Sequence, residues 1–225
     1  CHEFGHVLGL PDFYDTDYGD NGQAEELGPY SLMSNGNYNN MGRTPPYFNV
    51  MERALVGWIT PGEVAAIEQT GYYELDPVFM NTGVRSPTPS FTQNYFPDGE
   101  YYLYETRKKT GWDLYLPHEG LLIYHVDRSP EYLPRWDNNE VNNYSDHECF
   151  DLIEANDPYY TPFPGSLPVT EFTSLTLPSA VDWDRKATGY DLRHITRTGN
   201  RIAFTTGSSE PLPYYGIYMT KDVYA

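Results

Sequence analysis

The feature that most constrains this chain is a short pattern of two histidines and a glutamate at its start. His2, Glu3 and His6 have the spacing H-E-x-x-H. Residues four positions apart lie on one face of a helix, so both imidazoles can bind one zinc ion there. Glu3 would lie beside the open coordination position, where its carboxylate can take a proton from a water molecule. The pattern therefore predicts a short helix with a zinc site and Glu3 as the catalytic base.

The residues that follow make this pattern more specific. The chain continues with Gly9, Pro11 and Asp12, which gives H-E-x-x-H-x-x-G-x-x-D. We expect Gly9 to adopt a positive φ and end the helix, because glycine has no Cβ that would clash in that conformation. Pro11 then keeps the helix from resuming. The chain would turn back, and Asp12 would be the third zinc ligand, since a carboxylate oxygen is an ordinary ligand of zinc.

Three other carboxylates compete for the third position. Asp15 lies three residues further on, and Glu25 and Glu26 lie near the spacing at which thermolysin-like enzymes supply a glutamate from a second helix. Gly9 and Pro11 argue against a second helix, because they turn the chain back at once. The segment around Glu25 also lacks helical periodicity. We therefore favour the aspartate of the extended motif.

A methionine further along the chain lies among turn-forming residues. Met33 is the third residue of the run Ser31–Gly36. In metzincin peptidases a methionine in a tight turn lies beneath the zinc ligands as an apolar support. The alternative is an ordinary core methionine, but the extended motif upstream favours the Met-turn. Tyr38 is a candidate to hydrogen-bond the oxyanion of the tetrahedral intermediate, although its spacing is longer than in metzincins, which favours a packed or exposed tyrosine.

The run Cys1–Asp15 resembles the active-site stretch of the immune inhibitor A family of secreted metallopeptidases. Four further runs are similar to later landmarks of that family and extend the resemblance over roughly residues 1–207: 31–36, 55–58, 120–127 and 162–165. The resemblance implies a metzincin-like peptidase with zinc as cofactor, polypeptides as substrates, and a secreted or cell-surface location. In this family a propeptide, the upper sheet of the catalytic domain and the first turns of the zinc helix precede this point. We therefore expect a fragment that binds zinc weakly and has no peptidase activity on its own.

A glycine-interrupted acidic loop follows the zinc motif. Asp15, Asp17 and Asp20 lie close together in it. Clustered oxygen ligands could hold calcium, but the spacing departs from the EF-hand pattern, and a solvated acidic loop is the alternative. The asparagine-rich segment 137–143 raises the same question more weakly. The histidines outside the zinc motif lack partners at metal spacing and are expected to be structural or on the surface: His118, His125, His147 and His194.

The apolar periodicity changes from helical to strand-like at about Gly71. Before it, a helix is predicted to start at Thr44–Pro46 and to end before Thr60–Gly62. Beyond it, alternating and aromatic runs predict strands, of which the last two form a hairpin. The predicted strands are 72–75, 101–105, 121–126, 151–154, 191–195 and 201–205, with long loops at 127–149 and 156–190.

These elements predict an α+β fold of three parts. Residues 1–70 would be the C-terminal half of a metzincin-like metallopeptidase domain. Residues 71–207 would be a β-rich, sandwich-like region packed on that half. Residues 208–225 would be a linker or the start of a further module.

The chain is strongly acidic, with 32 Asp and Glu against 14 Lys and Arg and a net charge of −18. A surface of this sign argues against nucleic acids and anionic lipids as partners. No apolar run is long enough to span a membrane. The two cysteines, Cys1 and Cys149, are too few for a disulfide framework, so free thiols are favoured over a bridge. The sequence makes no prediction of the oligomeric state.

The rival function is a non-catalytic, β-rich binding or adhesion module with a vestigial metal motif. A lost glutamate or histidine would favour that function. Glu3 and both motif histidines are present, so we favour peptide hydrolysis.

Overall fold

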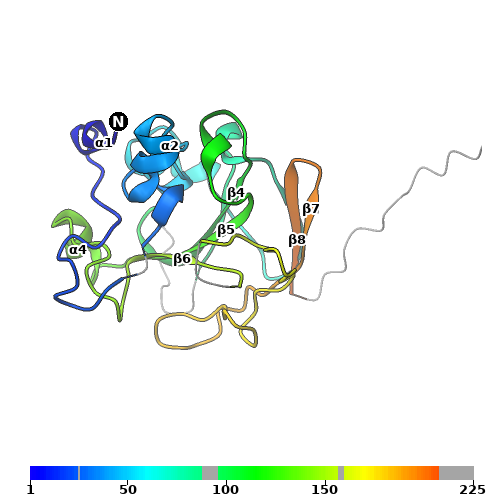
Figure 1. Ribbon diagram of the computed structural model, residues 1–225. Helices are drawn as coiled ribbons and strands as arrows, with labels where there is room; N and C mark the ends of the chain where they lie inside the picture. Colours follow the sequence, from blue (N-terminus) through cyan, green and yellow to red (C-terminus); the bar gives the residue numbers. More distant parts are fainter. Residues whose placement is uncertain (25, 88–95, 157–159, 208–225) are drawn as a thin grey trace, which may run out of the picture.

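The structure, a computed structural model, describes residues 1–24, 26–87, 96–156 and 160–207. Its largest element is a five-stranded sheet in the order β1-β3-β4-β5-β6, which packs against a three-stranded sheet in the order β2-β8-β7 (Figure 1). The larger sheet consists of β1 (Ala65–Ala66), β3 (Val84–Pro87), β4 (Gly99–Arg107), β5 (Gly120–Arg128) and β6 (Phe150–Ile153). The smaller sheet consists of β2 (Gly71–Leu75), β7 (Leu192–Thr198) and β8 (Arg201–Thr206).

Strand β4 is buried on both faces. It pairs with β5 along its entire length, in antiparallel register. Successive side chains of a strand point to opposite faces, and here Tyr101 and Leu103 enter one hydrophobic core while Tyr102 and Tyr104 enter the other. Burial on both faces explains why the sequence of β4 is an almost unbroken aromatic run rather than an alternation.

Two hydrophobic cores thus share the five-stranded sheet as a common wall. The first core joins one face of the sheet to the N-terminal part of the chain, through residues such as Phe13, Met33 and Met51. The second core fills the space between the two sheets and includes Leu75 and Phe204. The N-terminal segment is therefore packed directly on the strands that follow it.

The helices are all short. They are α1 (His2–Val7), η1 (Gly28–Tyr30), η2 (Asn35–Tyr38), α2 (Asn39–Gly42), α3 (Val50–Leu55), η3 (Pro61–Glu63), η4 (Val78–Met80), η5 (Gly111–Tyr115) and α4 (Leu133–Asp137). Figure 1 shows α1 and α4 on one side of the molecule and the β7–β8 hairpin on the opposite side. Within the described part of the chain, no helix has the length and apolarity needed to cross a bilayer.

The predicted α+β character and all six predicted strands are confirmed, including the final hairpin. Several short elements were missed, α4 and β3 among them. Helix α4 lies within the segment 127–149, which was predicted to be a loop, and β3 was not predicted at all. Both are too short for a periodic pattern to be visible in the sequence.

The start predicted for the helix that ends before Thr60–Gly62 is wrong. Helix α3 begins at Val50 rather than at Thr44–Pro46, because Asn49 forms the cap. The Asn49 side chain accepts a 2.8 Å hydrogen bond from the Glu52 N–H, and the Glu52 carboxylate accepts a 2.7 Å bond from the Asn49 N–H. This reciprocal capping box satisfies two amides that a helix start leaves unpaired.

The division into residues 1–70 and 71–207 stays a prediction. The predicted linker at 208–225 lies outside the described residues, as do positions 88–95 and 157–159 within the predicted β-rich region. Both cysteines are free thiols, with Cys1 exposed and Cys149 buried. Burial raises the pKa of the Cys149 thiol to about 12, so this thiol is protonated at neutral pH.

Candidate metal centre

Helix α1 presents two imidazoles on one face and then ends abruptly. Gly9 has a φ of +92°, as predicted. The Gly9 N–H donates to the His6 carbonyl at 2.9 Å, and the Leu10 N–H donates to the Gly5 carbonyl at 3.1 Å. These two bonds form a Schellman motif, the helix ending that a left-handed glycine permits. The chain therefore turns back towards the metal motif immediately after the helix.

This turn brings His2, His6 and Asp12 together. The Nε2 atom of His2 lies 3.1 Å from Asp12 Oδ1, and the Nε2 atom of His6 lies 3.3 Å from the same oxygen. Within the residues that the structure describes, these three form the one group of potential ligand atoms that lie within 4.8 Å of one another. The geometry thus selects the same three residues as the sequence pattern.

The second nitrogen of each imidazole is held by the backbone. His2 Nδ1 lies 2.8 Å from the Leu32 carbonyl, and His6 Nδ1 lies 2.9 Å from the Leu10 carbonyl. A carbonyl can only accept, so both Nδ1 atoms carry the proton. Each Nε2 is therefore the nitrogen left for a metal ion, as in a metal-binding histidine.

The surroundings of Asp12 show whether a metal ion fits between these residues. The residue is 6 % exposed, and its Oδ1 is buried without a hydrogen-bond donor. A buried carboxylate oxygen without a hydrogen-bond donor is unfavourable unless a cation compensates it. Two imidazole nitrogens and one carboxylate oxygen are a ligand set that suits zinc. The residues present therefore fit a zinc ion.

Met33 lies directly beneath α1, as a Met-turn residue does. It is fully buried, and its carbonyl accepts a 2.8 Å bond from the Phe13 N–H. A Cβ atom placed on Gly5 would lie only 2.3 Å from Met33 Sδ. The helix can rest on the methionine because Gly5 has no side chain. Sequence reasoning missed this role of Gly5, although the small residue between the two histidines was a visible signal.

The turn that carries Met33 rests on a buried carboxylate. Glu52 is 0 % exposed, and its Oε1 accepts hydrogen bonds from Ser31 Oγ at 2.6 Å and from the Met33 N–H at 3.2 Å. Burial raises the pKa of Glu52 to about 7, although these hydrogen bonds oppose the shift.

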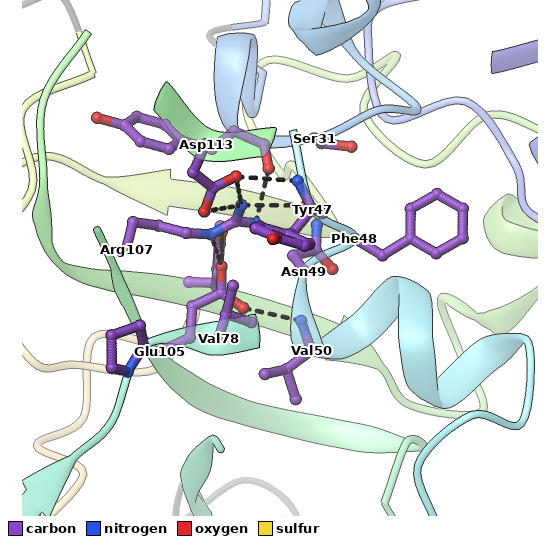
Figure 2. A network of polar contacts seen from close by, with 12 residues as sticks. Ser31, Tyr47, Phe48, Asn49, Val50, Val78, Glu105, Arg107 and Asp113 are labelled. Atoms are coloured by element: carbon purple, nitrogen blue, oxygen red, sulfur yellow. Dashed lines mark hydrogen bonds and ion pairs between the residues drawn. The ribbon is translucent and has the colours of Figure 1, made fainter. Parts of the chain in front are cut away.

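A charged network near Glu52 is centred on Arg107 of β4, which is fully enclosed. Figure 2 shows Arg107 with its partners Glu105 and Asp113. Its guanidinium donates to Glu105 at 2.7 Å and to Asp113 at 3.1 Å and 3.2 Å. It also donates to the carbonyl oxygen of Tyr30 at 3.0 Å. Burial alone would lower the pKa of Arg107, but the two carboxylates outweigh it and hold that pKa well above its usual range. No periodic pattern in the sequence indicates this network.

An open cleft of about 400 Å³ lies on the other side of the metal motif. Glu3 is exposed and lines it, and Tyr38, which is 71 % exposed, lies on its wall. Tyr14 also lines the cleft, and burial together with the nearby carboxylate of Asp12 raises the pKa of Tyr14. Sequence reasoning did not select Tyr14. The other lining residues are His2, Asp15, Tyr18, Gln23, Glu26, Ser34, Asn35 and Asn37.

The acidic loop after the motif forms local contacts instead of a second metal site. Asp15 Oδ1 accepts the Asp17 N–H at 3.1 Å, and Asp17 Oδ1 accepts the N–H groups of Gly19 and Asp20, both at 3.1 Å. Asp15, Asp17 and Asp20 are not brought together as a ligand group within the described residues. The loop geometry therefore gives calcium no support.

Of the two rival glutamates, Glu26 does not join the histidines. Glu26 accepts hydrogen bonds from the Asp15 N–H at 3.2 Å and from Asn35 Nδ2 at 3.1 Å. Glu25 lies outside the described residues.

The remaining histidines are structural or on the surface, as predicted: three have structural contacts, and His118 is exposed. His125 Nε2 lies 2.9 Å from Glu100, and His147 Nε2 lies 2.9 Å from Asp127. His194 bonds Thr205 at 2.9 Å.

Comparison with known proteins agrees with this geometry. Residues 1–55 match the family model described as the catalytic domain of the immune inhibitor A peptidases, peptidase M6. The resemblance to this family is confirmed. Immune inhibitor A of Bacillus thuringiensis subsp. alesti is 31 % identical over 125 residues, which cover 48 % of this chain and 18 % of that protein. The chain thus spans less than a fifth of the length of its immune inhibitor A relative.

Proposed function

We propose that this chain carries the metal centre of a zinc endopeptidase that cleaves polypeptides. The observation that supports it most is the meeting of His2, His6 and Asp12 around a buried oxygen without a donor, beside an exposed glutamate in an open cleft. When bound there, zinc would supply a Lewis acid that polarises the scissile carbonyl and acidifies a water molecule. The match to a family of metallopeptidases supports the same reaction class.

Glu3 is the proposed general base and acid. It follows His2 directly on α1 but is not one of the converging groups, and it lines the cleft that a substrate would enter. From this position its carboxylate can take a proton from the attacking water and later deliver it to the leaving amine. Tyr38 and Tyr14 line the same cleft and could offer a hydroxyl group to the oxyanion. Met33 supports the ligands from below.

A secreted or cell-surface location belongs to the same proposal, since it follows from the resemblance to a family of secreted peptidases. The acidic charge of the chain also agrees with polypeptide rather than nucleic-acid substrates.

The test is zinc content and casein cleavage by the full-length protein, compared between wild type and Glu3→Gln. We expect the variant to keep its zinc but to lose activity by a factor on the order of 10²–10⁴, the usual contribution of a general base. Glu68→Gln is the matched control, because Glu68 is exposed and lies outside the cleft. Full activity of Glu3→Gln would refute the role of Glu3, and a wild-type protein without zinc or cleavage would refute the function.

A further inference from the structure

Residues far along the chain complete the surroundings of the zinc motif. The segment after α4 lies against residues 12–16. Asn142 Nδ2 donates to the Phe13 carbonyl at 3.1 Å, and the Thr16 N–H donates to Asn143 Oδ1 at 3.0 Å. The Phe13 ring packs edge-on against Trp136 of α4, with ring centroids 5.7 Å apart. The loop that carries the third ligand therefore lies on this distant segment.

One residue of the segment binds the third ligand itself. Asn139 Nδ2 donates to Asp12 Oδ2 at 2.8 Å, and Asn139 Oδ1 accepts from the Asp12 N–H at 2.6 Å. The two residues are 127 positions apart in the sequence. The amide thus holds both the backbone and the side chain of Asp12 through a closed ring of two hydrogen bonds.

This pairing determines which oxygen of Asp12 faces the histidines. Oδ2 is occupied by the amide, while Oδ1 is left without a donor at 3.1 Å and 3.3 Å from the two imidazole nitrogens. Rotation of the carboxylate would break the bond to Oδ2. A neutral amide suits this position because it offers one donor and one acceptor, whereas a carboxylate would place a second negative charge beside Asp12.

Asn139 is itself held by the end of α4. Its φ is +62°, and the Glu140 N–H donates to the Arg135 carbonyl at 2.8 Å. Its own carbonyl accepts a 3.2 Å bond from Thr16 Oγ1. The left-handed position after a helix is normally glycine, and asparagine is the other residue that is common there. Asn139 can therefore end the helix and, at the same time, present its side-chain amide to Asp12.

We propose that Asn139 is a positioning residue for the third zinc ligand: its amide fixes the Asp12 carboxylate so that Oδ1 faces the metal position between His2 and His6. This inference rests on the proposed zinc function. Hydrogen-bonding partners of metal ligands typically change metal affinity 10-fold to 100-fold when they are removed.

The decisive variant is Asn139→Gly in the full-length protein. Glycine tolerates the positive φ at least as well as asparagine, so the end of α4 is kept while the amide is lost. We expect the zinc dissociation constant, measured by competition with a chromophoric chelator, to rise by about 10-fold to 100-fold. The visible absorption bands of the Co²⁺-substituted protein should also shift, because they report the ligand geometry. Asn138→Gly, at the exposed neighbouring asparagine, should change neither measurement.

A second variant covers the case in which glycine loosens the fold. Asn139→Asp keeps an acceptor for the Asp12 N–H but replaces the donor to Oδ2 by a repelling oxygen. We expect it to weaken zinc binding at least as much as Asn139→Gly, while the metal-free protein still unfolds cooperatively. Wild-type zinc affinity and Co²⁺ spectra in both variants would make Asn139 a helix cap only. A folded wild-type protein that binds no zinc would instead overturn the proposed function, and this inference with it.

Discussion

Helix α1 separates a buried side from an open one. On the buried side Gly5 rests on Met33, Met33 is held by Glu52, and the fully enclosed Arg107 lies behind them. On the open side Glu3 is exposed and lines a cleft of about 400 Å³. The buried side holds the imidazoles in place, whereas the open side carries the groups that would meet a substrate. Substitutions on the two sides of α1 should therefore differ in whether they change metal binding, activity or stability.

The largest effect on zinc content and peptidase activity is expected at Asp12, the proposed third ligand, where the two sides of α1 meet. Asp12→Ala should remove zinc and peptidase activity together, because it deletes the oxygen that faces both imidazoles. Zinc content after dialysis and casein cleavage by the full-length protein measure this. Asp15→Ala is the matched control, since it removes the same side chain three residues later and should keep the metal. The reverse outcome, with zinc lost only from Asp15→Ala, would show that the wrong aspartate was named.

A smaller effect is expected from the buried network. Arg107→Met would leave Glu105 and Asp113 buried without their cation. Removal of one partner of a buried ion pair typically costs about 3–5 kcal/mol of unfolding free energy. Urea unfolding of both proteins measures the loss. Arg197→Met should change stability little, because its ion pair with Glu119 is at the surface; an equal loss in the two variants would contradict the special role of the enclosed arginine.

The smallest effect concerns the pH dependence of stability. The pKa of Glu52 is raised to about 7 in the folded protein, above the usual glutamate value of about 4.3. The folded state therefore binds a proton more tightly than the unfolded state, so stability from this group is present below about pH 4.3 and is lost as the pH rises through 7. The loss is on the order of 3 kcal/mol.

Glu52→Gln cannot titrate, so its unfolding free energy should fall less steeply than that of wild type between pH 5 and 8. Urea unfolding at several pH values gives both slopes. Glu68→Gln, at an exposed position, should retain the wild-type slope. Identical slopes for wild type and Glu52→Gln would mean that Glu52 is ionised throughout this range.

The parts of the structure that the sequence predicted are those with local signals. The residues from His2 to Asp12 form one continuous pattern, and the structure brings the three expected ligand residues together. The long strands β4 and β5 were equally visible, because burial on both faces leaves an apolar or aromatic run in the sequence. The start of α3 was missed although Asn49 and Glu52 have the spacing of a capping box, so that error was avoidable.

The parts that the sequence could not predict depend on contacts between distant segments. No periodicity connects Arg107 with Tyr30, and none connects Asn139 with Asp12. An asparagine after a helix is an ordinary helix ending, and only the folded chain shows that its amide reaches the metal motif. The support of the candidate site is therefore tertiary, while its ligands are local.

The hydrogen bonds between Asp12 and Asn139 have a consequence for protein synthesis. The two residues are 127 positions apart, and a ribosome that adds about 5–20 residues per second needs roughly ten seconds to travel that distance. During this time His2, His6 and Asp12 have left the ribosome without the amide that orients the carboxylate. In the proposed zinc site, the Asp12 carboxylate would therefore gain its orienting partner only after α4 has been synthesised.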